Sequence, residues 1–151
     1  VGHLFGDEMI ALDREGRVHW QEMVAMPRMW LVADDIVTFV ERWLLELSLP
    51  RLGLRIQGRH GLALSDALGL APVAEASDRH ERWWQGEGIF VGEPLPYDFI
   101  VNGAPEAPST VVRLSKASLS PGLADALVAL GAKVTSDAPK LVAALKKHGL
   151  G

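Results

Sequence analysis

The chain has 151 residues, of which 48% are hydrophobic and 23% are charged, a composition typical of a globular domain rather than a disordered one. It contains no cysteine, which excludes disulfides, thiolate metal sites and a cysteine nucleophile. No uncharged apolar run approaches the length of about 18 residues that a transmembrane helix needs, and the first residues lack the pattern of a secretory signal. The sequence therefore predicts a cytoplasmic protein without a membrane partner.

The charge is mildly acidic and unevenly distributed. There are 15 basic and 19 acidic residues, a net charge of −4. Residues 1–50 carry 4 basic and 9 acidic groups, whereas residues 101–151 carry 6 basic and 3 acidic groups. A nucleic-acid-binding domain usually presents a basic face, and the first two thirds of the chain have none. We therefore expect no nucleic-acid partner, while a basic protein would suit the acidic balance.

The N-terminal part of the chain reads as a hairpin followed by a third strand. Met9–Leu12 and Arg17–Val24 are two short apolar or alternating segments. Between them, Asp13 favours the first position of a turn and Gly16 supplies the positive φ that closes it. The apolar run Trp30–Val32 predicts the next strand.

The clearest helix of the sequence is predicted over residues 35–48. Asp34 or Asp35 caps its N-terminus, because a carboxylate accepts hydrogen bonds from the free amide groups there, and Pro50 ends it. We interpret the adjacent acids as caps rather than as a catalytic pair. The spacing also predicts that an apolar stripe, with Trp43 in it, faces the core. This stripe consists of Ile36, Phe39, Val40, Trp43, Leu44 and Leu47.

The remaining two thirds of the chain contain further strands and two C-terminal helices. Alternation or β-branched residues predict strands at Leu52–Gln57, Ile89–Val91, Tyr97–Val101 and Thr110–Leu114. Caps and apolar spacing predict helices over about 121–130 and 137–148.

This order of elements predicts an α+β fold with a mixed or antiparallel sheet, one central amphipathic helix and two C-terminal helices. We expect a single domain over residues 1–151. A subdivision near Pro50 would separate a hairpin–strand–helix unit, residues 1–50, from the remainder, residues 51–151.

Motifs for catalysis are missing from the sequence. The five histidines show neither i, i+4 spacing nor an H-E-x-x-H pattern, and neither a G-x-S-x-G elbow nor a phosphate-binding glycine loop occurs. Asp78, His80 and Glu81 are close in sequence, but a solvated charge cluster explains them better than a metal site. We therefore expect no catalytic residue, no metal and no cofactor.

The adjacent tryptophans Trp83 and Trp84 lie among acidic residues, of which Glu81 and Glu87 are the nearest. Tryptophan is enriched in binding hot spots, and neighbouring acids can meet arginine or lysine on a partner. These four residues are the predicted partner-binding site. The competing interpretation is that one tryptophan packs inside and the other covers the edge of the core.

Residues 5–47 resemble part of a known family. Phe5-Gly6-Asp7 precedes an apolar strand, and Asp13, Gly16 and Val18 match a D-x-x-G-x-V hairpin that is followed by a short strand and a helix containing Phe39. This pattern resembles the later half of the SMI1/KNR4 superfamily, also called SUKH. The resemblance implies a bacterial immunity protein that binds and neutralises a cognate toxin, often a nuclease or deaminase. It transfers no site residue, because toxin-binding surfaces vary within the family.

Three hypotheses of function follow. The first is a non-enzymatic protein-binding domain of the immunity class with a protein partner, such as a basic toxin domain. The second is an enzyme or small-ligand domain whose site is assembled from distant residues, with His60, His80, Glu75 and Asp78 as contributors. The third is an interaction or assembly module of a larger protein. The sequence leaves the oligomeric state open.

Overall fold

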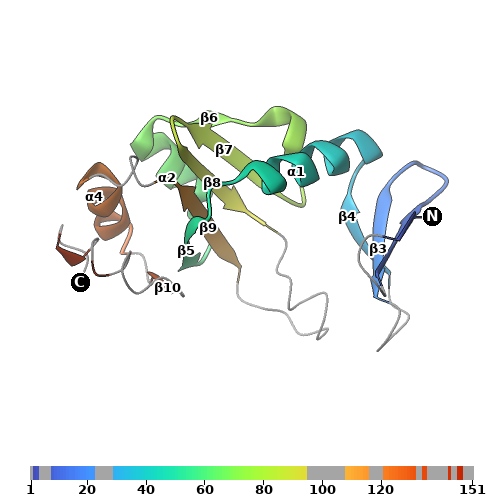
Figure 1. The fold of residues 1–151 in the computed structure, drawn as a ribbon, viewed down its shortest axis with the longest axis horizontal. Helices are drawn as coiled ribbons and strands as arrows, with labels where there is room; N and C mark the ends of the chain where they lie inside the picture. Colours follow the sequence, from blue (N-terminus) through green and yellow to red (C-terminus); the bar gives the residue numbers. More distant parts are fainter. Residues whose placement is uncertain are drawn as a thin grey trace.

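The structure is a computed structural model. It describes residues 2–3, 8–22, 29–94, 108–115, 121–131 and 134–135, together with Ala143, Lys146 and Lys147. Two antiparallel sheets, one of four and one of six strands, lie at opposite ends of the helix α1 (Figure 1). The predicted α+β class is confirmed.

The first sheet contains four strands in sequential order: β1 (Gly2–His3), β2 (Glu8–Leu12), β3 (Val18–Glu22) and β4 (Met29–Ala33). The predicted hairpin joins β2 to β3, and the Asp13 carboxylate accepts hydrogen bonds from the backbone N–H groups of Glu15 and Arg17 at 3.0 and 2.9 Å. Val18, Trp20, Val32 and Ala33 form a small core at this sheet. Trp20 and Trp30 lie against each other there, with ring centroids 6.1 Å apart.

Helix α1 (Ile36–Ser48) begins and ends where the sequence predicts. The Asp35 side chain accepts from the backbone N–H of Thr38 at 2.9 Å, so Asp35 rather than Asp34 is the cap. At the other end Leu49 is extended, the conformation that a following proline imposes.

The second sheet has the order β10-β5-β9-β8-β7-β6. The bounds of its strands are β5 (Leu52–Gln57), β6 (Ala71–Pro72), β7 (Arg82–Gly86), β8 (Ile89–Glu93), β9 (Ser109–Leu114) and β10 (Val134–Thr135). The predicted strands at 52–57, 89–91 and 110–114 are confirmed. The predicted strand at 97–101 lies outside the described residues.

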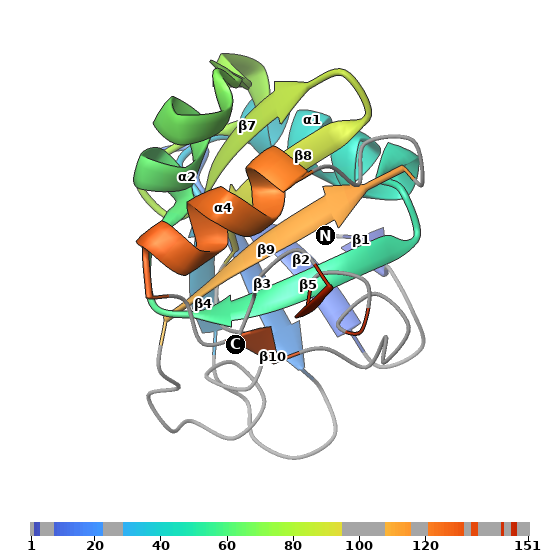
Figure 2. The ribbon, with the colours of Figure 1, turned by 90° about the vertical axis from the view of Figure 1, so that its left-hand side faces the viewer.

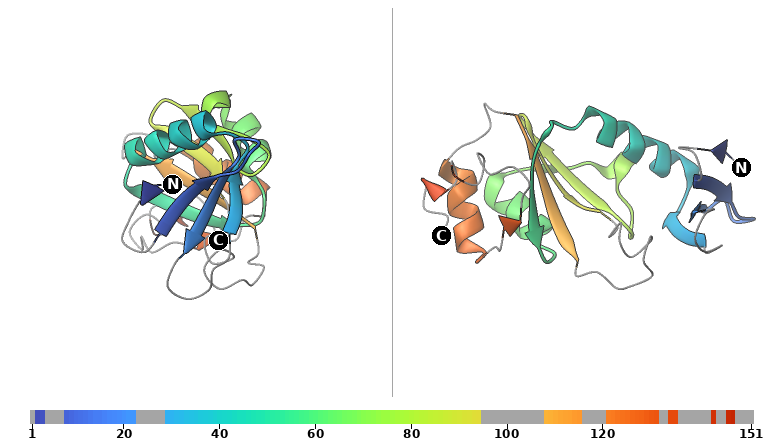
Figure 3. Two further views of the ribbon diagram at one scale, coloured as in Figure 1. Left: turned by 90° about the vertical axis from the view of Figure 1, so that its right-hand side faces the viewer. Right: turned by 60° about the horizontal axis from the view of Figure 1, so that its bottom comes forward.

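One face of the six-stranded sheet is covered by α2 (Gly61–Leu68) and α4 (Pro121–Ala129), as Figure 2 shows. The main core lies between this face and the two helices, and it includes Leu54, Ile56, Leu64, Trp84, Val91, Val112, Leu114, Leu123 and Leu127. The opposite face looks toward α1 and the first sheet, and the short 3-10 helix η1 (Ala74–Ala76) lies beside α1 (Figure 3).

The predicted helix at 121–130 is confirmed as α4. Of the one predicted at 137–148, only Ala143, Lys146 and Lys147 are described, and the backbone N–H of Lys147 donates to the Ala143 carbonyl at 3.3 Å, a helical i to i−4 bond. Among the described residues, none of the helices is long and apolar enough to cross a membrane.

Candidate functional site

Helix α1 buries the side opposite to the one that the sequence predicts: its polar side faces the fold and most of its apolar stripe faces solvent. Its buried residue is Arg42, which is 5% exposed, whereas Trp43 is 37% and Leu47 is 68% exposed. Of the predicted stripe, only Phe39 packs against the core of the first sheet. The prediction that the stripe faces the core, with Trp43 inside, is therefore wrong. The reason is that α1 bridges the two sheets and contacts the rest of the fold mainly through its polar side.

The Arg42 guanidinium joins three separate parts of the chain. Its Nη1 donates to the carbonyl of Val32 in β4 at 2.8 Å, and its Nε donates to the carbonyl of Ala76 in η1 at 3.2 Å. Its Nη2 lies 2.8 Å from Oδ1 of Asp78, and its Nε lies 3.2 Å from Oε2 of Glu81. These contacts fix α1 between the two sheets through a buried ion-pair network.

The acids of this network are held by a tight loop before β7. Oδ1 of Asp78 accepts from the backbone N–H groups of His80 and Glu81 at 2.8 and 3.0 Å, and Oδ2 accepts from that of Asp34 at 3.2 Å. Burial alone would raise the pKa of Asp78, but the hydrogen bonds from Glu81, His80 and Asp34 and the charge of Arg42 outweigh it and lower the pKa. Asp78 is therefore ionised and paired at neutral pH.

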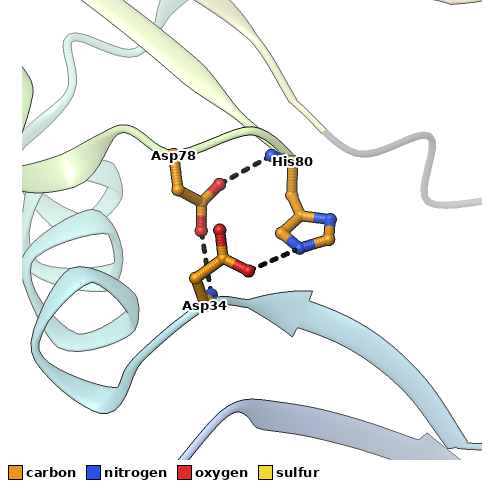
Figure 4. A group of neighbouring side chains, drawn as sticks. All are labelled: Asp34, Asp78 and His80. Atoms are coloured by element: carbon orange, nitrogen blue, oxygen red, sulfur yellow. Dashed lines mark hydrogen bonds and ion pairs between the residues drawn. The ribbon is translucent and has the colours of Figure 1, made fainter.

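Asp34, Asp78 and His80 come together at the junction between the first sheet and the loop, as Figure 4 shows. One donor atom of each lies within 4.8 Å of the others, which is the spacing of a candidate metal site. The donors are already engaged, however. Oδ1 of Asp34 lies 2.7 Å from Nη2 of Arg79 and 3.4 Å from Nε2 of His80, and Asp78 holds Arg42. A cation would compete with two guanidinium groups, so the residues fit an ion-pair network better than a metal centre.

Three of the four predicted partner-binding residues lie inside the fold. Trp83 and Trp84 are 3% and 7% exposed, and Glu81 is 8% exposed, whereas Glu87 is exposed. The two tryptophans are neighbours on strand β7, so their side chains point to opposite faces of the sheet. Trp84 joins the main core, and Trp83 covers Gly92 on the other face, where a Cβ would collide with the indole ring. As long as this fold holds, these three side chains are not accessible to a partner.

The residues named for an enzymatic site are only partly brought together. Asp78 and His80 share the junction, and Glu75 is exposed on η1. His60 precedes α2, where its backbone N–H donates to Oγ1 of Thr110 and its Nε2 lies 3.0 Å from the carbonyl of Gln57. His60 therefore belongs to the packing of α2 on β9 and not to the junction.

Most of the exposed large apolar side chains of the described residues lie on the outward side of α1. Six apolar residues recur at helical spacing and form one continuous surface, which we call the α1 apolar face. Its members, with their exposed fractions, are Ile36 (40%), Val37 (66%), Val40 (39%), Trp43 (37%), Leu44 (52%) and Leu47 (68%). Single exposed apolar residues are common, but a contiguous group of this kind marks an interaction site.

Two acids border the α1 apolar face, one on each side. Glu41 lies four residues after Val37 and three before Leu44, and Glu46 lies three residues after Trp43. Both residues are exposed. Although Glu46 keeps accessible surface, desolvation of its carboxyl group and the negative charge of Glu81 raise its pKa to about 7.

No protein-family model, curated protein or solved structure matches this chain. The resemblance of residues 5–47 to the SMI1/KNR4 superfamily therefore stays a prediction from the sequence. Function is therefore inferred from the geometry of α1 and its surroundings.

Proposed function

We propose that the protein is a non-enzymatic protein-binding domain and that the α1 apolar face is its docking surface. The observation that carries this proposal is the exposure of six apolar side chains on one side of a helix whose opposite side holds a buried arginine. Fully burying one valine, leucine or isoleucine side chain is worth about 1.5–3 kcal/mol, so a partner that covers the face gains a substantial driving force.

The most exposed residues of this face, Val37 (66%), Leu44 (52%) and Leu47 (68%), contribute little to the stability of the fold. Helix α1 is held by the Asp35 cap, by Phe39 in the first core and by the four contacts of Arg42. Exposing these apolar side chains to water is unfavourable, and a partner that covers them explains why the helix carries them.

The resemblance to the SMI1/KNR4 superfamily gives this binding role a biological context. An immunity protein acts by covering the active site or substrate groove of a toxin, which requires a docking surface and no catalytic residues. In this proposal the surface lies on the helix that ends the segment carrying the resemblance, residues 5–47.

The experiment compares capture of partners by three versions of the full chain from the lysate of the source organism, followed by mass spectrometry. They are the wild type, the double variant Leu44→Gln/Leu47→Gln, and a control, Leu62→Gln. Leu62 is 53% exposed but lies on α2, away from the α1 apolar face. Glutamine has a helix propensity close to that of leucine, so the substitutions change the surface rather than the helix.

The proposal predicts one stoichiometric protein that the wild type and the control capture and that the double variant loses. If that protein is a nuclease or deaminase and the wild-type chain inhibits it, the immunity role is supported as well. A partner retained equally by all three versions would show that the docking surface lies elsewhere than on α1. Enzymatic turnover by the chain alone would contradict the non-enzymatic role.

A further inference from the structure

The shape of the α1 apolar face restricts what can cover it. Helix α1 has 13 residues and is therefore about 20 Å long. Its backbone hydrogen bonds are made within the helix, so it offers no edge to an incoming strand. A second helix with an apolar stripe complements a convex helix of this kind, because the side chains of the second helix fit between the side chains of α1.

The charges around this face are acidic. Three exposed acids lie next to it, Glu41 and Glu46 on its two borders and Asp35 before its first turn, and Glu46 also lies near enough to Arg113 for the two charges to interact. The one basic residue of α1, Arg42, is buried on the opposite side in contact with Asp78 and Glu81. Arg51, after the helix, is the nearest exposed base in sequence. Both borders thus carry an acid, although Glu46, whose pKa is raised to about 7, is only partly ionised at neutral pH. They lie within a segment, residues 1–50, of 4 basic and 9 acidic groups.

This charge pattern distinguishes a second copy of the chain from a different protein. In a two-fold dimer each face would meet its own duplicate, so the acidic borders would be brought toward each other. Like charges across an interface disfavour the pairing, whereas lysine or arginine opposite Glu41 and Glu46 favours it. In helical pairs such flanking charges determine the choice of partner.

We propose, on the basis of the protein-binding function above, that the α1 apolar face docks a basic amphipathic helix of another protein, with an apolar stripe flanked on both sides by lysine or arginine. The apolar stripe provides most of the affinity. The flanking bases pair with Glu41 and with the ionised form of Glu46 and select the partner.

The test uses three synthetic helical peptides of about 18 residues, long enough to span α1. The first has a leucine stripe flanked by lysines, the second has the same stripe flanked by glutamates, and the third is a scrambled form of the first without a stripe. Binding to the full chain is measured by fluorescence anisotropy at physiological salt and pH 8, where Glu46 is mostly ionised. We expect the lysine-flanked peptide to bind at least tenfold more tightly than either of the others.

Two variants connect this preference to the face. Leu44→Gln/Leu47→Gln should lower the affinity for the lysine-flanked peptide at least tenfold. Glu41→Lys should lower that affinity about fivefold and raise the affinity for the glutamate-flanked peptide. Glu75→Lys is the matched control, because Glu75 is an exposed acid on η1, outside the face. It should leave both affinities unchanged.

Three binding results would overturn the proposed partner chemistry: the lysine-flanked peptide binds no more tightly than the glutamate-flanked peptide, it binds no more tightly than the scrambled peptide, or it does not bind at millimolar concentration. A change in affinity caused by Glu75→Lys that is as large as the change caused by Glu41→Lys would overturn it as well. A dimer in sedimentation equilibrium that Leu44→Gln/Leu47→Gln dissociates would assign the face to a second copy instead. Any of these can occur while the captured natural partner still depends on Leu44 and Leu47, in which case the protein-binding function stands and only the partner chemistry fails.

Discussion

Arg42 shows how a single residue can set the orientation of a helix. Its guanidinium satisfies two backbone carbonyls, those of Val32 and Ala76, and faces the two acids Asp78 and Glu81. A buried ion pair is not strongly stabilising compared with apolar packing, but removing one partner leaves uncompensated charges behind. Arg42 therefore specifies which side of α1 turns inward.

The first prediction concerns Arg42→Met. The variant leaves Asp78 and Glu81 buried without their cation, so we expect the free energy of unfolding to fall by about 3–5 kcal/mol. Urea denaturation at pH 7 measures this loss. Arg59→Met, at an exposed position, is the control and should change the value by less than about 0.5 kcal/mol. Equal effects of the two substitutions would show that the network does not hold α1.

Trp83 provides a second test, because the sequence favours a binding role for this residue whereas its side chain is only 3% exposed. Trp83→Ala should lower the free energy of unfolding by about 3–5 kcal/mol, since it opens a large cavity beside Gly92. The buried indole N–H has no hydrogen-bond partner among the described residues, so Trp83→Phe should be much milder. Thermal and urea denaturation distinguish the two. A stable Trp83→Ala variant that fails to bind its partner would restore the binding role.

Glu46 gives a pH-dependent prediction. Its pKa is raised from 4.5 to about 7 in the folded chain, so the folded state holds this proton over a range in which the unfolded state has lost it. Its contribution to stability is complete below about pH 4.5 and is lost as the pH rises to about 7. Glu46→Gln should therefore match the wild type at low pH and become the more stable of the two as the pH increases through this range.

Denaturation curves at several pH values between 4.5 and 8 measure this difference. Glu75→Gln, which replaces an exposed acid on η1, is the matched control and should show a difference from the wild type that does not follow the same course. A constant difference between Glu46→Gln and the wild type across the range would show that the carboxyl group has its ordinary pKa.

At the scale of the element, periodicity predicts where α1 lies but not what it faces. The apolar spacing, the acidic cap and Pro50 define residues 36–48 correctly. A period of 3.6 residues shows that one side is apolar, and the usual expectation is that this side is buried. The lone arginine of the helix is the sign of the actual orientation, but its partners Asp78 and Glu81 lie more than 30 residues further along the chain. Local pattern cannot reveal that pairing.

The orientation of α1 predicts an unequal response to the same substitution in two helices. Leu44→Gln/Leu47→Gln on the α1 apolar face should change the free energy of unfolding by less than about 1 kcal/mol, because both residues are more than half exposed. Leu127→Gln in α4, at a position that is 0% exposed, should cost several times more, on the order of 3 kcal/mol or above. Similar losses would mean that α1 buries its stripe.

Strand β7 illustrates a second limit of sequence analysis. Residues 73–88 are polar around two adjacent tryptophans and show neither a helical nor an alternating pattern. The strand forms because Glu87 and Gly88 make a tight turn, with Gly88 at φ 65°, and return the chain as β8. Since both faces of this sheet are covered at β7, adjacent tryptophans can both be buried, and the pattern of a half-exposed strand is lost.

For the whole molecule, the order of elements predicts the class of fold and allows a subdivision near Pro50, but the sequence does not show that the strands on each side of α1 form two separate sheets. The strands before and after α1 each pair among themselves, and the two sheets meet through Arg42, the Asp78 loop and Asp34. These contacts are polar and long-range. The candidate docking surface is a consequence of this architecture, because a helix that connects two bodies through its polar side leaves its apolar side in solvent.

Thiol labelling of a Leu47→Cys variant shows whether the α1 apolar face is open to solvent and to a partner. The chain has no other cysteine, so the reagent reports on this position alone. We expect the native variant to react within about tenfold of its rate in denaturant at both low and high protein concentration, as a residue that is 68% exposed should. We also expect the lysine-flanked peptide to protect the thiol. Native labelling slower by a hundredfold or more at low protein concentration would show that the chain itself covers this face, which would then not be a docking surface.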